Sequence, residues 1–349
     1  MTADSGQRAW LRDFLAAEGL YVFTVNAFPY GPFKGRSVME QVYEPDWASP
    51  DRVRYTRQVA DILADITGPE VSPSIQSAPL AFRSKVSGPE DVRLLSQNLL
   101  LAVAHLVDLE RRTGRRVKLA LELEPFCFLE TTEETVEYFE SQVYSTEATR
   151  TLTRLTGLPA GEVHSAVRRH LGVVFDICHQ SVQFEDIGAA LGLLVAHGIP
   201  IFKLQAASAL WVPAVTADAV TEIEAFTDTI YLSQTTQLRD GELTRFLNLA
   251  DAIPRVIHNV GSRLAVGLHP APRVGWVGAE KMPKIGAAGR VGRAAVPGRR
   301  CVLWGGGPPE CDGGGHVRQV DKITDNPSPS HSPITEANAP TSASHAPRP

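Results

Sequence analysis

The chain has 349 residues, which is enough for one barrel-sized domain or for two smaller ones. Its composition, with 43% hydrophobic, 21% charged and 7% aromatic residues, is that of a soluble globular protein. The net charge of −5 conceals an asymmetry: residues 1–270 carry 24 basic and 33 acidic side chains, whereas residues 271–349 carry 10 and 6. An acidic folded part argues against a nucleic-acid partner, because phosphate backbones are held by basic surfaces.

The cysteines and the N-terminus indicate the compartment. The four cysteines form no C-x-x-C pair and are too sparse for a disulfide framework, which favours a reducing environment. The segment MTADSGQRAWLRDF lacks the basic and then apolar pattern of a signal peptide, and no apolar run reaches the length of a membrane span. We therefore expect a cytoplasmic protein without a membrane span.

Short β-branched runs alternate with long amphipathic stretches between residues 10 and 270. The runs that predict strands are 21–28, 71–78, 117–124, 171–178, 199–206 and, with a weaker pattern, 263–269. The helices between them carry start and stop signals. In chain order these are Ser49-Pro50 before a helix ending at Gly68, Pro89 before one ending at Gly114, Thr131 with Glu134 as a capping box, and Asp186 before one reaching His197.

This strand–helix rhythm implies parallel pairing, because each crossover needs about a dozen residues or more. An open doubly wound sheet and a closed (β/α)8 barrel both fit. The first strand is not followed by G-x-G-x-x-G, and there is no P-loop. Polar residues cluster instead at the carboxyl ends of successive strands, where barrels build their sites. We therefore predict an α/β fold of the (β/α)8, TIM-barrel type.

Two carboxylates end the strand at 117–124. Glu122 and Glu124 are two residues apart, so both point to one face of the strand, where a cation at a barrel mouth would neutralise them. We expect Glu124 to be the metal ligand and Glu122 to support it in catalysis. The alternative is a single inward glutamate paired with an arginine or lysine.

The next strand runs into Asp176 and His179, at the point where the chain turns. A carboxylate and an imidazole at this spacing can converge on one divalent transition metal. The alternative is an aspartate that caps the following helix beside a bystander histidine. Three further histidines, His164, His170 and His197, lie in helical segments with polar neighbours and are expected at the surface.

Lys203 and Gln205 share one face of the strand at 199–206 and are assigned to catalysis, the lysine as an acid/base or oxyanion-holding group. The alternative is that Lys203 only forms an ion pair with Glu122 or Glu124. The loop after the first strand is stiffened by Gly and Pro, and Asn26, Tyr30 and Lys34 are its candidates for contact with substrate. It can equally be a packed surface loop.

Composition changes abruptly near residue 271. Gly and Pro make up 30 of the first 270 residues but 23 of the last 79. Such a segment buries too little apolar surface to offset its backbone entropy, so 271–349 is predicted to be disordered. Two origins remain open: a natural flexible tail, or a frameshift product. The Gly, Arg and Pro richness of 285–315 resembles out-of-frame GC-rich codons and favours the second.

The segments LYVFTVNAFPYGPFKGRSVMEQVYEPDW, LALELEP, FDICH and FKLQAASAL resemble the EboE-type metabolite traffic proteins, within the xylose-isomerase-like (sugar phosphate isomerase/endonuclease IV-like) TIM-barrel superfamily. The resemblance covers about 10–270. It implies that Glu124, Asp176 and His179 bind a divalent metal such as Zn, Mn or Mg, with His269 as a looser match. Relatives carry a histidine on the strand where this chain has Lys203 and Gln205, which disfavours a multi-zinc nuclease site.

The same resemblance implies an incomplete barrel at 1–270, without the first strand and the last one or two. A fragment of that kind exposes strand edges and would be marginally stable and weakly active or inactive. The leading hypothesis is a metal-dependent isomerase or lyase acting on a small metabolite, in a gene cluster for secondary-metabolite biosynthesis and export whose other proteins are possible partners. The alternative is a non-catalytic metabolite carrier, followed by an endonuclease IV-like hydrolase.

Overall fold

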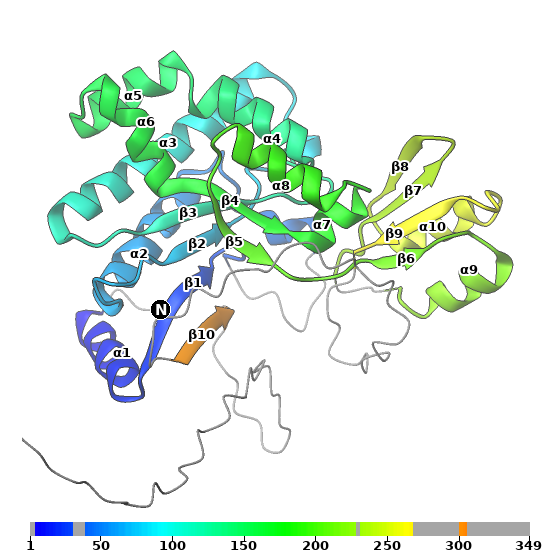
Figure 1. Cartoon of the computed structure of the whole chain (residues 1–349), viewed down its shortest axis with the longest axis horizontal. Helices are drawn as coiled ribbons and strands as arrows, with labels where there is room; N and C mark the ends of the chain where they lie inside the picture. The colour runs from blue at the N-terminus through cyan, green and yellow to red at the C-terminus, as the bar shows by residue number, and fades with distance from the viewer. Residues whose placement is uncertain (1–3, 31–38, 228–230, 268–299, 306–349) are drawn as a thin grey trace, which may run out of the picture. The chain divides into compact units, whose positions relative to one another are not determined.

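The computed structural model describes residues 4–30, 39–227, 231–267 and 300–305 (Figure 1). All of them lie within one compact unit, residues 1–307. Lys34 and His269 lie outside the described residues. The segment expected to be disordered, 271–349, also lies outside them, except for residues 300–305. Strand β10 (Arg300–Gly305) pairs in parallel with the first strand of the sheet.

A parallel sheet with the order β10-β1-β2-β3-β4-β5 forms the centre of the fold. Its other strands are β1 (Leu20–Asn26), β2 (Ser74–Ser77), β3 (Lys118–Glu122), β4 (Leu171–Asp176) and β5 (Ile201–Gln205). The five strands predicted between residues 21 and 206 are therefore present and pair in parallel, which confirms a mixed α/β fold with consecutive crossovers.

Helices flank and connect these strands, and four of them begin at the predicted signals Ser49, Pro89, Thr131 and Asp186. They are α1 (Ser5–Ala17), α2 (Pro50–Ile66), α3 (Pro89–Thr113), α4 (Thr132–Tyr138), α5 (Thr146–Thr156), α6 (Ala160–His170), α7 (Ile177–Val182) and α8 (Ile187–Ala196). Short 3₁₀ turns lie at Met39–Tyr43 and Arg83–Lys85, and a π turn at Phe139–Val143. The Ser49 hydroxyl accepts from the Asp51 N–H, and Thr131 with Glu134 forms the predicted capping box.

The two faces of the parallel sheet differ in polarity. Ile75, Leu121 and Phe175 point from neighbouring strands into the main apolar core beneath the helices. The opposite face carries polar side chains towards the carboxyl ends of the strands. On that face Lys203 of β5 donates to Gln76 of β2, although three strand spacings in a flat sheet would separate them by roughly 14 Å. The sheet is therefore curled, with its polar face on the concave side.

Helix α3 is the one described helix that is long and apolar enough to cross a membrane, contrary to the expectation that no run reaches that length. However, 56% of its most apolar 18-residue stretch is buried inside the protein. Leu99, Val103 and Leu106 are in the main core, and the helix packs against α2, α5 and α6. It has the packing of a core helix.

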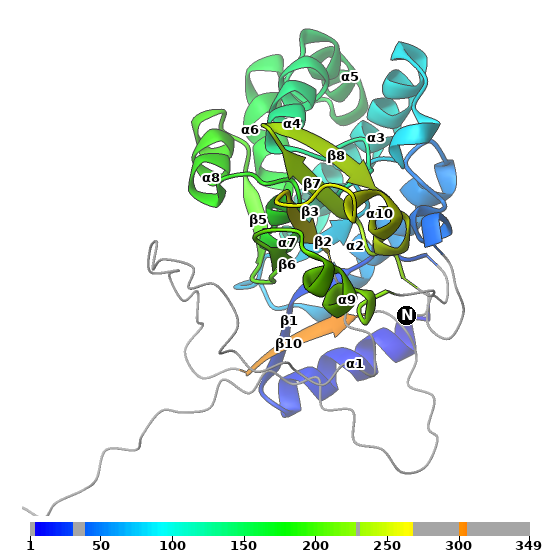
Figure 2. The same ribbon diagram turned by 90° about the vertical axis from the view of Figure 1, so that its right-hand side faces the viewer.

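A second sheet, antiparallel with the order β6-β9-β7-β8, follows the parallel one in the chain. Its strands are β6 (Leu210–Val212), β7 (Thr235–Arg239), β8 (Glu242–Phe246) and β9 (Arg263–Val266), with α9 (Ala217–Glu224) and α10 (Leu249–Val256) beside them. Figures 1 and 2 show it beyond the carboxyl ends of β4 and β5.

This second sheet corrects the prediction for 263–269, which assigned that run to a further parallel barrel strand. β9 instead pairs antiparallel with both β6 and β7. The hairpin between β7 and β8 turns at Asp240-Gly241, and both residues have positive φ, as a two-residue hairpin of type I′ requires. The Asp-Gly pair was a readable hairpin signal in the sequence.

Candidate metal centre

Three potential metal ligands converge at the carboxyl ends of β3 and β4. Each of Glu122, Asp176 and His179 offers one ligand atom, and these three atoms lie within 4.8 Å of one another. The three residues are nearly removed from solvent, with exposed fractions of 5%, 6% and 9%. Glu122 ends β3, Asp176 ends β4, and His179 lies in α7, which begins directly after β4.

Local structure fixes the direction of the Asp176 and His179 side chains. Asp176 is the N-cap of α7, and its Oδ1 accepts from the Cys178 N–H at 2.8 Å. His179 Nδ1 lies 2.8 Å from the Leu123 carbonyl oxygen. A carbonyl only accepts, so Nδ1 carries a proton, and Nε2 is the nitrogen left for a metal once it is deprotonated. The helix-capping role of Asp176, predicted as an alternative, is therefore confirmed. The cap uses Oδ1 and does not use Oδ2.

The electrostatics of the site are dominated by buried negative charge. The pKa of Glu122 is raised to about 7, mainly by burial; Glu124 and Asp176 also raise it, whereas His179 and the Gln76 hydrogen bond lower it. For His179, burial opposes the charged form, but Asp176, Glu124 and Glu122 raise the pKa to about 9. Three carboxylates thus face one imidazole.

This donor set fits a divalent cation. Two carboxylates and an imidazole nitrogen are ligands that Zn²⁺, Mn²⁺ and similar ions accept, and a cation would offset the excess of buried negative charge. The structure thus places Glu122, rather than the expected Glu124, in the group of three.

Two side-chain amides hold the carboxylates. Gln205 Nε2 donates to Glu122 Oε1 at 2.8 Å and also to Asp176 Oδ2. Gln76 Nε2 donates to Glu122 Oε2, and Gln76 Oε1 accepts from Lys203 Nζ. Burial lowers the pKa of Lys203, an effect that Glu122 and Asp176 oppose. Lys203 and Gln205 therefore reach the site, as their shared strand face predicted.

Glu124 lies next to this group and forms a second polar contact set. Its Oε1 accepts from the Tyr43 hydroxyl at 2.7 Å and from Gln234 Nε2 at 3.3 Å. Burial raises the pKa of Tyr43 well above its usual value, and Cys127 and Glu124 add to this. Gln234 directly precedes β7, so the segment leading into the antiparallel sheet contributes to this end of the site. The role of Glu124 as a ligand stays a prediction.

The first loop is only partly described. Asn26 Oδ1 accepts from the Phe28 N–H at 2.9 Å and so shapes its own turn. Tyr30 is exposed and its ring lies 5.1 Å from that of Tyr55. No described contact joins either residue to Glu122, Asp176 or His179. Substrate contact by Asn26 and Tyr30 therefore remains a prediction.

The expectation that His170 lies at the surface is wrong, since it is fully buried. Its Nδ1 lies 2.9 Å from the Val117 carbonyl oxygen and its Nε2 lies 2.9 Å from Glu110 Oε2. His170 is the last residue of α6 and directly precedes β4. The amphipathic pattern of a helix does not predict the burial of its last residue, where the chain turns into the sheet. His170 anchors the start of β4.

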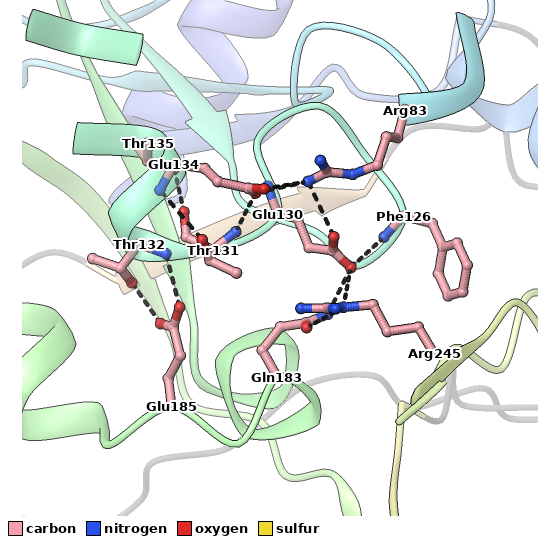
Figure 3. A network of polar contacts seen from close by, with 10 residues as sticks. All are labelled: Arg83, Phe126, Glu130, Thr131, Thr132, Glu134, Thr135, Gln183, Glu185 and Arg245. Atoms are coloured by element: carbon pink, nitrogen blue, oxygen red, sulfur yellow. Dashed lines mark hydrogen bonds and ion pairs between the residues drawn. The ribbon is translucent and has the colours of Figure 1, made fainter. Parts of the chain in front are cut away.

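A buried carboxylate, Glu130, links the surroundings of the site to the antiparallel sheet (Figure 3). It accepts from the Phe126 N–H at 3.0 Å and from Gln183 Nε2 at 2.9 Å. It also pairs with Arg83 at 3.1 Å and with Arg245 of β8 at 3.2 Å. Gln183 directly follows α7, so Glu130 connects the helix that carries His179 to β8.

Three residues of the site were not singled out from the sequence: Gln76, Tyr43 and Gln234. Gln76 had a signal, because it is a polar residue near the end of a predicted strand, like Glu122 and Asp176. Tyr43 and Gln234 lie 81 and 110 residues from Glu124 in the chain. No local pattern connects them with it.

No family model matches the chain, and no curated protein matches it. Among solved structures, it is similar to that of the IolI protein with a bound zinc atom. The identity is 13% and the TM-score is 0.30. The alignment covers 58% of this chain and 56% of that one, so the chain spans little more than half the length of this neighbour.

Proposed function

We propose that the carboxyl ends of β3 and β4 bind a divalent metal ion through Glu122, Asp176 and His179, and that the protein is an isomerase- or lyase-type enzyme for a small polar metabolite. The convergence of the three ligand atoms within 4.8 Å of one another carries this proposal. The hydrogen bond from His179 Nδ1 to the Leu123 carbonyl supports it, because it orients the ring and leaves Nε2, once deprotonated, as the nitrogen for a metal.

When bound, the metal supplies Lewis-acid polarisation of a substrate carbonyl or hydroxyl. The protein's own residues prepare the place for this chemistry. Gln205 orients one oxygen of Glu122 together with Asp176 Oδ2, and the Leu123 carbonyl orients His179. The low exposure of the three side chains excludes bulk water, which strengthens charge interactions in the site.

The wider setting belongs to the same proposal. We infer from the segments LYVFTVNAFPYG and FKLQAASAL that the chain is an EboE-like, xylose-isomerase-like barrel protein of the cytoplasm, associated with secondary-metabolite biosynthesis or export. The curled parallel sheet is compatible with part of a barrel of that kind.

A second candidate is a non-catalytic carrier that binds a metabolite at the same place. One observation favours it: each oxygen of Glu122 accepts a hydrogen bond from a side-chain amide, of Gln205 or of Gln76. Metal analysis separates the two candidates.

The test is metal content after purification, and titration of the chelator-treated protein with Mn²⁺ and Zn²⁺ by calorimetry. The metal proposal expects one ion per chain, with affinity reduced more than about 100-fold in Asp176→Asn and His179→Gln, since each removes a direct ligand. His197→Gln is the matched control, because His197 pairs with the exposed Glu140 at 2.6 Å and has no described contact with Glu122, Asp176 or His179. Wild-type protein that binds neither ion would refute the metal proposal and support the carrier.

A further inference from the structure

A continuous run of hydrogen bonds crosses the concave face of the curled sheet. It passes from Lys203 on β5 to Gln76 on β2, then to Glu122 on β3, and through Gln205 on β5 to Asp176 on β4. Lys203 and Gln76 are 127 residues apart in the chain and meet only because the sheet curls. The run ends on two of the three candidate ligands.

The chemistry of its members fixes the direction of each bond. A lysine ammonium only donates and an ionised carboxylate only accepts, whereas a glutamine amide does both. Because Lys203 occupies the oxygen of Gln76, the amide must turn its NH₂ group towards Glu122. Without the ammonium, the Gln76 amide could rotate and direct its oxygen at the carboxylate, where two acceptors would face each other.

The described contacts of Lys203 distinguish it from the other charged groups around the site. Its Nζ donates to Gln76, and no hydrogen bond or ion pair joins it to Glu122, Asp176 or Glu124 among the described residues. Lys203 is also half-buried, so the access of its ammonium group to solvent is restricted. Its hydrogen-bonded influence on Glu122 therefore passes through the Gln76 amide, in addition to the direct charge attraction between Lys203 and the carboxylates of Glu122 and Asp176.

We propose that Lys203 is a positioning residue that acts through Gln76 to hold Glu122 in the orientation required for metal binding, in place of the proton-transfer role expected from the sequence. This inference rests on the proposed metal site. In this inference Gln76 connects the Lys203 ammonium on β5 to the Glu122 carboxylate on β3, and the ammonium fixes which end of the Gln76 amide faces Glu122.

A double-mutant cycle tests it, with Mn²⁺ affinity measured by calorimetry for Lys203→Met, Gln76→Leu and the double variant. Each single variant is expected to weaken binding by about 10-fold or more, the range found for partners behind metal ligands. The double variant is expected to bind no more weakly than Gln76→Leu, because the described hydrogen-bond route from Lys203 to Glu122 passes through Gln76.

Two conservative variants keep the test informative if Lys203→Met fails to fold, which thermal melting of the metal-free protein reveals. Lys203→Arg remains a pure donor and should retain most of the affinity. Lys203→Gln can accept as well as donate, no longer fixes the Gln76 amide, and should lose affinity.

The outcomes separate this inference from the proposed function. Wild-type protein that binds neither Mn²⁺ nor Zn²⁺ refutes the metal site, and the positioning role with it. Metal binding that survives Lys203→Met and Lys203→Gln unchanged, or losses that multiply in the double variant, overturn the positioning role and leave the metal site standing.

Discussion

The Glu130 network offers a sharp test of how the site is supported. We predict that Glu130→Gln destabilises the protein by about 2 kcal/mol. The carboxylate is 4% exposed and forms charge-assisted pairs with Arg83 and Arg245. Two such bonds contribute about 1.5–3 kcal/mol each. We reduce their sum by roughly half, because the arginines are 43% and 33% exposed and regain hydration when the charge is removed.

Urea unfolding followed by circular dichroism measures this free energy, and Glu137→Gln is the matched control. Glu137 is an exposed carboxylate of α4, for which a change within about 0.5 kcal/mol is expected. Hydrogen exchange gives a second readout: amides of β8 should exchange faster in Glu130→Gln, because Arg245 loses its charged partner. Equal stability of the two variants, with unchanged exchange in β8, would refute the role of Glu130 as the link between the sheets.

Three further predictions concern charge, packing and metal. Burial raises the pKa of Asp46 in the folded protein, so the stability that this carboxyl contributes is present below its unfolded pKa of 3.8 and is lost as pH rises through the folded pKa. Asp46→Asn keeps the acceptor for the Ala48 N–H. By urea unfolding, this variant should be more stable than wild type at pH 7 but not at pH 3. Gly172→Ala should lower the unfolding free energy by about 1–3 kcal/mol, because a Cβ there would lie 2.3 Å from the Pro200 carbonyl oxygen. Gly161→Ala is the control and should not destabilise the protein, because a Cβ there would meet open space. Equal melting temperatures of the two variants would contradict this prediction. Mn²⁺ at 100 times its dissociation constant should raise the unfolding free energy by about 2.7 kcal/mol, reversibly with chelator and not in Asp176→Asn.

Much of the fold could be predicted from the sequence, because the signals involved are local. Strands β1 to β5 follow from β-branched runs, and the helices begin at Ser49, Thr131 and Asp186 because those side chains accept hydrogen bonds from nearby backbone N–H groups. The carboxyl-end rule also placed Glu122, Asp176 and His179 in one region. These features depend on residues a few positions apart.

The remaining features were decided by contacts between distant segments. The antiparallel sheet was missed because its strands are short and β9 pairs with two strands that precede it, so the run at 263–266 looks the same in either sheet. A register shift between Val173 and Val174 sets Gln205 opposite Asp176, and a curl of the sheet brings Lys203 to Gln76. Sequence periodicity determines which face a side chain takes, but curl and register depend on the packing of the whole sheet. The sequence alone therefore determined the region of the site, and the tertiary structure decided which carboxylate joins Asp176 and His179.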